Sequence, residues 1–175
     1  MNKEEIQIRK ARITDANVLS ELGKKTFYDT WKGTATEENL QIFMNDSYNI
    51  ERIKSELNSP LHTYLILENE GVAIGYAKIE ETKNLPDELK NFNCIEVNKV
   101  YLDKNCKGKG LGKLLMNECM QIAKEKNKEC IYLGVWEENI RAVRLYKSYG
   151  FESFGRHQFL IGSQIDWDLW MMKMI

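Results

Sequence analysis

With 175 residues, 43% of them hydrophobic and 29% charged, the chain has the size and composition of one folded domain, which we expect over residues 1–175. These values exclude a disordered or fibrous protein. The formal net charge of −1 gives no general attraction to nucleic acid, so we expect no nucleic-acid partner.

Neither the cysteines nor the histidines have the close spacing of metal ligands: Cys94, Cys106, Cys119, Cys130, His62 and His157. We therefore predict no metal site and expect the thiols to be reduced and mostly buried. The charged segment 1–10 lacks the apolar stretch of a signal peptide, and no apolar run approaches the ~20 residues that span a bilayer. We expect a soluble, cytoplasmic protein without a membrane partner.

The first third of the chain favours one strand followed by helices. Residues 6–9 indicate a short strand, and Thr14 with Asp15 offers a cap for a helix with apolar residues near helical spacing. Thr36 offers a second helix start, and a third short helix is expected over residues 50–57.

After Pro60 the pattern changes to strands. The β-rich runs at 62–68 and 72–79 flank a predicted hairpin turn, and 94–102 forms a further strand beyond a polar loop at 80–91. The remaining chain predicts a helix, a strand at 130–136, a helix at 139–149 and strands at 151–160 and 165–174. This order predicts an α+β or mixed α/β fold with at least one strand–helix–strand crossover.

A glycine-rich turn joins the 94–102 strand to the next helix. Glycines there let a ligand approach the backbone, and the free N–H groups of the helix start form a site for an anion such as phosphate. The spacing fits neither a P-loop nor a dinucleotide-binding turn, and a purely structural turn remains an alternative. The turn and its lysines are Lys107, Gly108, Lys109, Gly110, Leu111, Gly112 and Lys113.

A second segment follows one crossover later: Leu133-Gly134-Val135-Trp136-Glu137-Glu138-Asn139, then Ala142, Leu145-Tyr146 and Gly150-Phe151. Together, the two segments resemble the pyrophosphate turn and the next strand and helix of the GNAT superfamily of N-acetyltransferases. The resemblance implies a central, mostly antiparallel sheet of about seven strands flanked by helices, and acetyl-CoA as the acetyl donor. Position 107 departs from the family's usual Arg or Gln, and lysine meets a phosphate only as a point charge.

Within the superfamily, the chain is most similar to the PaiA-type polyamine acetyltransferases. The matching stretches are 26–31, 100–102, 110–113, 133–137 and 169–174. The resemblance implies a small amine such as spermidine or spermine as acceptor, and a homodimer, because family members often form dimers. Two alternatives stay open: acetylation of a protein N-terminus or another amine, and an acyl-CoA-binding regulatory protein with little catalysis.

The expected chemistry requires a base and an acid. At pH 7 only about one alkyl amine in a few thousand carries a free lone pair, so a carboxylate must accept a proton. Glu96 is our candidate, because the family often keeps an acidic base on this strand; Glu80 and Glu81 are rivals, and a surface carboxylate is the alternative. Tyr146 occupies the family's position for the acid that assists the leaving thiolate, although an aromatic core residue would look the same.

The resemblance also implies where the donor and acceptor bind. The backbone of Val100, Tyr101 and Leu102 would pair with the pantetheine arm, the glycine-rich turn would hold the pyrophosphate, and Asn139 beside Tyr146 would contact the cofactor. Asn139 is equally a candidate helix cap. Carboxylates and aromatic faces suit a polyammonium chain, which gives five acceptor-binding candidates: Tyr28, Asp29, Trp31, Glu37 and Glu38.

Overall fold

A mixed sheet of seven strands forms the centre of the protein, for which a computed structural model describes residues 5–175. The strands span Ile6–Lys10 (β1), His62–Asn69 (β2), Val72–Glu80 (β3), Cys94–Leu102 (β4), Cys130–Trp136 (β5), Glu152–Ile161 (β6) and Gln164–Met174 (β7). Their order is β1-β2-β3-β4-β5-β7-β6, with only the β4–β5 pair parallel, which confirms the predicted sheet. Residues 1–4, part of the charged segment and of the domain expected over 1–175, lie outside the described residues.

Five α-helices accompany the sheet within residues 5–175: Ala16–Trp31 (α1), Glu37–Ser47 (α2), Ile50–Leu57 (α3), Leu111–Glu125 (α4) and Ile140–Ser148 (α5). Thr36 and Asn49 cap α2 and α3, because their side-chain oxygens accept hydrogen bonds from N–H groups of the first turn. Asp15 occupies the N-cap position of α1, but the expected cap is wrong, because the Asp15 side chain accepts no hydrogen bond from an N–H group of α1. Its carboxylate instead accepts from the Arg12 N–H at 2.7 Å and from the Arg9 guanidinium.

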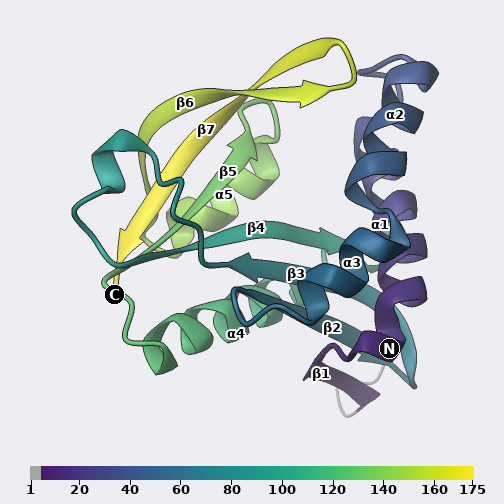
Figure 1. The fold of residues 1–175 in the computed structure, drawn as a ribbon, viewed down its shortest axis with the longest axis horizontal. Helices are drawn as coiled ribbons and strands as arrows, with labels where there is room; N and C mark the ends of the chain where they lie inside the picture. The colour runs from purple at the N-terminus through teal and green to yellow at the C-terminus, as the bar shows by residue number, and fades with distance from the viewer. Residues whose placement is uncertain (1–4) are drawn as a thin grey trace.

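The helices cover the two faces of the sheet in separate groups (Figure 1). Helices α4 and α5 pack on one face, where Ile131 and Leu133 of β5 are buried. Helices α1 to α3 pack on the other face, against Ile66 and Tyr76. Leu89, in the polar loop after β3, is fully buried in a separate small cluster with Cys130 and Tyr132 of β5. No helix in the described part of the chain has both the length and the apolar character needed to cross a membrane.

Strands β4 and β5 separate after a short paired stretch. They pair only between Cys94–Glu96 and Cys130–Tyr132, and beyond these residues the two strands diverge. Asn98 has no partner on β3, because Lys78 pairs with Lys99 while Ile79 pairs with Val97. This bulge bends β4 away from β5 and leaves backbone N–H and C=O groups facing the gap without a strand partner.

The structure corrects the expectation of four reduced thiols. Cys94 and Cys130 face each other in the parallel β4–β5 register and are joined by a disulfide, while Cys106 and Cys119 are free and buried. The sequence could not reveal this pair, because its 36-residue separation matches no motif and only the strand register brings the sulfurs together.

Alkylation should therefore find two reactive thiols in the unfolded, unreduced protein and four after reduction, as measured by intact mass. In the chain-entropy model the bond stabilises the fold by about 4 kcal/mol for a loop of this length, so reduction should lower the free energy of unfolding in urea by a similar amount. Four labelled thiols without reduction would contradict the pairing.

Candidate active site

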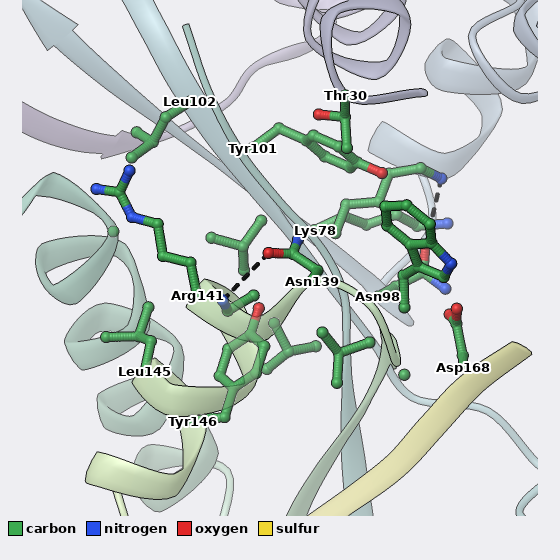
Figure 2. A pocket seen from close by; sticks show the side chains of 18 of the residues that line it. Thr30, Lys78, Asn98, Tyr101, Leu102, Asn139, Arg141, Leu145, Tyr146 and Asp168 are labelled. Atoms are coloured by element: carbon green, nitrogen blue, oxygen red, sulfur yellow. Dashed lines mark hydrogen bonds between the residues drawn. The ribbon is translucent and has the colours of Figure 1, made fainter. Parts of the chain in front are cut away.

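The gap between β4 and β5 opens into a cavity of about 970 Å³. Its walls come from strands β3 to β7, from the glycine-rich turn and α5, and from α1, α2 and α3. Figure 2 shows Arg141, Leu145 and Tyr146 of α5 on one side of this cavity and Asp168 of β7 on the other. One continuous space thus reaches both faces of the sheet.

The glycine-rich turn forms the entrance on the α4 side. Gly108 and Gly110 have φ angles of 91° and 81°, a left-handed conformation that residues with a Cβ rarely adopt. Gly110 is the N-cap of α4, so the first N–H groups of that helix and its dipole face the cavity. All residues from 107 to 113 except Lys109 line the cavity, and together they form an anion site.

Two arginines of α5 join this anion site, and sequence reasoning missed both. Arg141 and Arg144 line the cavity, and a Cβ at Gly108 would lie 3.4 Å from the Arg141 guanidinium. Their spacing of three residues at the start of a helix was the available signal, because such residues share one helix face. Asn139 caps the same helix by accepting a hydrogen bond from the Ala142 N–H at 3.2 Å, and it also lines the cavity.

The three β4 residues expected beside the pantetheine arm all line the cavity. Val100 and Leu102 pack toward α4, whereas Tyr101 packs on the opposite face of the sheet. Their strand has no β5 partner at this level, so its edge is available for strand-like pairing with an extended ligand.

Tyr146 lies on α5 with its ring in the core and its hydroxyl directed into the cavity (Figure 2). Burial, followed by the Cys119 and Tyr101 groups, raises the pKa of this phenol. The hydroxyl therefore keeps its proton at physiological pH, which suits a proton donor.

Glu96 lines the cavity on the other side of the β4–β5 gap. Its carboxylate accepts hydrogen bonds from the Asn98 amide at 3.1 Å and the Tyr132 hydroxyl at 3.3 Å. Burial raises its pKa, and the nearby Glu80 charge raises it further. Glu80 also lines the cavity but is held by Lys78 at 2.9 Å, whereas Glu81 lies outside it, paired with two lysines.

Of the five acceptor-binding candidates, the structure brings only Trp31 to this cavity. Tyr28 packs against the α1–α3 core, and Asp29 lines a smaller neighbouring hollow, where it pairs with Lys32 and Lys104.

Glu37 and Glu38 are exposed in the first turn of α2, where carboxylates favour the helix dipole. Sequence reasoning missed the aromatic neighbours of Trp31. The ring of Trp136 lies 4.8 Å from it and that of Phe159 lies 5.5 Å away.

Two lysines also reach the acceptor side of the cavity. Lys78 is buried and neutralised by Glu56 at 3.0 Å and by Glu80. Lys99 donates a hydrogen bond to the Asn98 side chain and lies over the ring of Tyr48. Burial lowers the pKa of Lys99 to about 8, with a further contribution from the Lys78 charge. The acceptor side therefore carries charges of both signs.

Comparison with known proteins identifies the family. Residues 24–151 match the acetyltransferase (GNAT) family, and the chain belongs to it. It is an acyltransferase. A relative in Lactobacillus delbrueckii subsp. lactis, described as an uncharacterized N-acetyltransferase, is 28% identical over 152 residues, 87% of each chain.

Other relatives differ in their described acceptors. The spermine/spermidine N(1)-acetyltransferase of Bacillus subtilis is 33% identical over 91 residues, 51% of this chain and 59% of that protein. The N-alpha-acetyltransferase RimI of Mycobacterium tuberculosis is 30% identical over 120 residues, 68% of this chain and 71% of its own. The crystal structure of PaiA N-acetyltransferase from Thermoplasma acidophilum in complex with coenzyme A superimposes with a TM-score of 0.78 at 22% identity, covering 97% and 99% of the two chains, which shows the shared fold.

Proposed function

We propose that this enzyme transfers the acetyl group of acetyl-CoA to a primary amine, and that the amine is a polyamine such as spermidine or spermine. The observation that carries the proposal is one cavity that joins an anion site at the start of α4 to the Glu96 carboxylate across the β4–β5 gap. A long anionic donor enters from one side of the sheet and a cationic acceptor from the other.

The chain offers groups that fit each part of the donor. The N–H groups at Gly110 and Gly112 and the Arg141 guanidinium fit the pyrophosphate, and the open edge of β4 at 100–102 fits the amide-bearing pantetheine arm. When bound, the donor supplies the acetyl group as a thioester. Because these contacts fix position, they lower the entropic cost of bringing the two substrates together.

Glu96 and Tyr146 supply the proton transfers. Glu96 accepts the proton of the acceptor ammonium, directly or through water, and its raised pKa makes it a stronger base than an ordinary glutamate. A free N–H of β4 stabilises the negative charge that develops on the acetyl oxygen. Tyr146 donates its proton to the departing sulfur. The acetyl group passes directly from the donor to the amine, so no covalent enzyme adduct is needed.

A polyamine acceptor is supported by the Bacillus subtilis relative and by aromatic and carboxylate groups on the acceptor side. A second acceptor, a protein N-terminus, is favoured by Lys99, because its ammonium group is suited to a backbone carbonyl or carboxylate. The RimI relative supports the same alternative.

An amine panel tests the proposal. CoA-thiol release should be measured with acetyl-CoA and, side by side, spermidine, spermine, a short peptide with a free N-terminus and an aminoglycoside. We expect the largest kcat/KM with a polyamine. A preference for the peptide would replace the polyamine by the alternative acceptor. Donor binding without turnover of any amine would instead favour an acyl-CoA-binding regulatory protein.

Replacing Arg141 with alanine should weaken CoA binding about ten- to a hundred-fold, because a hydrogen bond to a charged group contributes about 1.5–3 kcal/mol. Isothermal titration calorimetry with CoA measures the change. Lys147→Ala is the matched control, since Lys147 lies on the same helix, is exposed and does not line the cavity. Equal affinities of the two variants would remove Arg141 from the donor site.

We place the enzyme in the cytoplasm as a homodimer. Both residues of the Cys94–Cys130 disulfide are buried, which limits the access of soluble thiols and slows reduction of the bond in a reducing compartment. Leu160, Ile165 and Trp167 of the β6–β7 hairpin are exposed and supply apolar surface for a dimer contact. Light scattering will distinguish a dimer from the 20.5 kDa monomer.

A further inference from the structure

Asp168 is a buried carboxylate on the acceptor side of the cavity that the chemistry above does not use. It lies on β7 opposite Trp136 of β5, is 8% exposed and lines the cavity (Figure 2). Its Oδ1 atom is buried without a hydrogen-bond partner among residues 5–175. A buried charge without a partner is costly, so the position calls for a ligand or a proton.

His157 on β6 lies opposite Asp168 in the β6–β7 register, and the Tyr101 hydroxyl is close enough to sense its charge. The His157 Nε2 and Asp168 Oδ2 atoms are 3.9 Å apart, too far for a hydrogen bond. His157 stacks on Trp170 at 3.7 Å between ring centroids, and its Nε2 is also buried without a hydrogen-bond partner within the described residues. Two orphaned polar groups therefore adjoin the same cavity wall.

Gly134 of β5 makes this arrangement sterically allowed. A Cβ there would lie 2.8 Å from His157 Nε2 and 3.3 Å from Asp168 Oδ2. Because Gly134 itself lines the cavity, its missing side chain leaves both polar groups open to the space between β4 and β5. Any larger residue would displace them.

The charges around Asp168 favour a cation. Within residues 5–175, no lysine or arginine forms an ion pair with Asp168. After burial, the negative charges of Asp166 and Glu137 raise its pKa further, to about 7. The aromatic rings of Trp31 and Trp136 also line the cavity, and such faces attract organic ammonium groups.

We propose that Asp168, beside His157, binds an ammonium group of the acceptor and so positions the acceptor in the cavity. This subsite rests on the proposed function, since it assumes an amine acceptor. A diamine or polyamine suits it best, because one ammonium can be held by Asp168 while another amine reaches Glu96. Asp168 would act in binding and Glu96 in proton transfer.

Calorimetric titration of the CoA-loaded protein with 1,4-diaminobutane and spermidine tests the subsite without relying on turnover. Asp168→Asn should weaken amine binding about ten- to a hundred-fold, because it removes a charge-assisted contact. Asp166→Asn is the matched control, because it makes the same change of net charge two residues away on β7, outside the cavity lining. Without direct contact to the bound ammonium, it should change the affinity by no more than about two- to three-fold.

The pH dependence gives an independent readout. Wild-type affinity for the diamine should rise between pH 6 and pH 8 as Asp168 ionises, because the diamine stays cationic throughout. Burial lowers the pKa of His157, and this ring is therefore mostly neutral in the upper part of the window. Lys99, with a pKa of about 8, and Glu96, with a raised pKa, also face this cavity in both proteins. The rise in affinity should therefore be clearly smaller in Asp168→Asn than in the wild type, and the difference between the two profiles reports Asp168.

The outcomes separate this subsite from the proposed function. Unchanged affinity in Asp168→Asn, an equal loss in Asp166→Asn, or no diamine binding by the wild type would each overturn the subsite. Diamine binding that depends on Asp168, without CoA release in the amine panel, would uphold the subsite and contradict the transferase proposal. A loss in kcat with unchanged affinity would make Asp168 a proton acceptor instead and would also overturn it.

Discussion

Replacing Glu96 with glutamine should lower kcat/KM for the amine by about a hundred- to a thousand-fold at pH 7, because general-base catalysis typically contributes 10²- to 10⁴-fold. Glutamine keeps the size of the side chain and one acceptor for the Tyr132 hydroxyl, but it cannot accept the ammonium proton. CoA-thiol release at saturating acetyl-CoA measures the effect.

The pH profile should identify the group that is lost. Burial raises the pKa of Glu96, so the carboxyl gains its proton at a higher pH than an exposed glutamate. The wild-type kcat/KM should therefore fall as the pH is lowered through this raised pKa, and this acidic limb should be absent in Glu96→Gln. The ionised form is disfavoured in the fold, so neutral glutamine should not lower stability near pH 7.

Two variants provide the comparison. Glu81→Gln changes an equivalent carboxylate outside the cavity, and its activity should stay close to wild type. Glu80→Gln removes a rival base that the structure holds in an ion pair with Lys78. A larger loss in Glu80→Gln than in Glu96→Gln, or a retained acidic limb in Glu96→Gln, would transfer the base role away from Glu96.

The elements of the fold were predictable because local signals specify them. The bounds of α3, β4 and β5 agree with the periodicity, and Thr36 caps α2 as expected, because its hydroxyl accepts a hydrogen bond from the Asn39 N–H. The Cys94–Cys130 pair was not predictable, since it depends on the register of two strands separated by a helix. Asp15 likewise bonds Arg9 of another element rather than α1.

The candidate site divides in the same way. The glycine-rich turn is a local feature. Its glycines are recognisable in the sequence, and the structure shows Gly108 and Gly110 in the left-handed conformation that glycine favours. The acceptor side is assembled from five or more elements, so Glu37 and Glu38 looked suitable by composition yet lie outside the cavity. Asp168 belongs to an alternating polar pattern of β7, and only the pairing of β7 with β5 brings its side chain to the cavity beside Gly134.

Replacing Tyr146 with phenylalanine should slow kcat by about ten- to a thousand-fold without abolishing turnover. The leaving thiolate has a conjugate acid near pKa ~8.5, so it departs unaided at a reduced rate, and the phenol only assists. Burial raises the pKa of Tyr146, which keeps this donor protonated across the assay range. The KM for acetyl-CoA should change little, because the ring and its packing against Phe151 remain.

Tyr149→Phe is the matched control for this substitution. Its hydroxyl lies 2.7 Å from the Asn117 side-chain oxygen and 3.0 Å from the Lys113 carbonyl, two acceptors for its one proton, and Tyr149 does not line the cavity. Its loss should therefore cost about 1 kcal/mol of stability and leave kcat close to wild type. Full activity in Tyr146→Phe would remove this phenol from the mechanism. An equal loss in both variants would indicate that α5 packing, rather than proton donation at the sulfur, determines the rate.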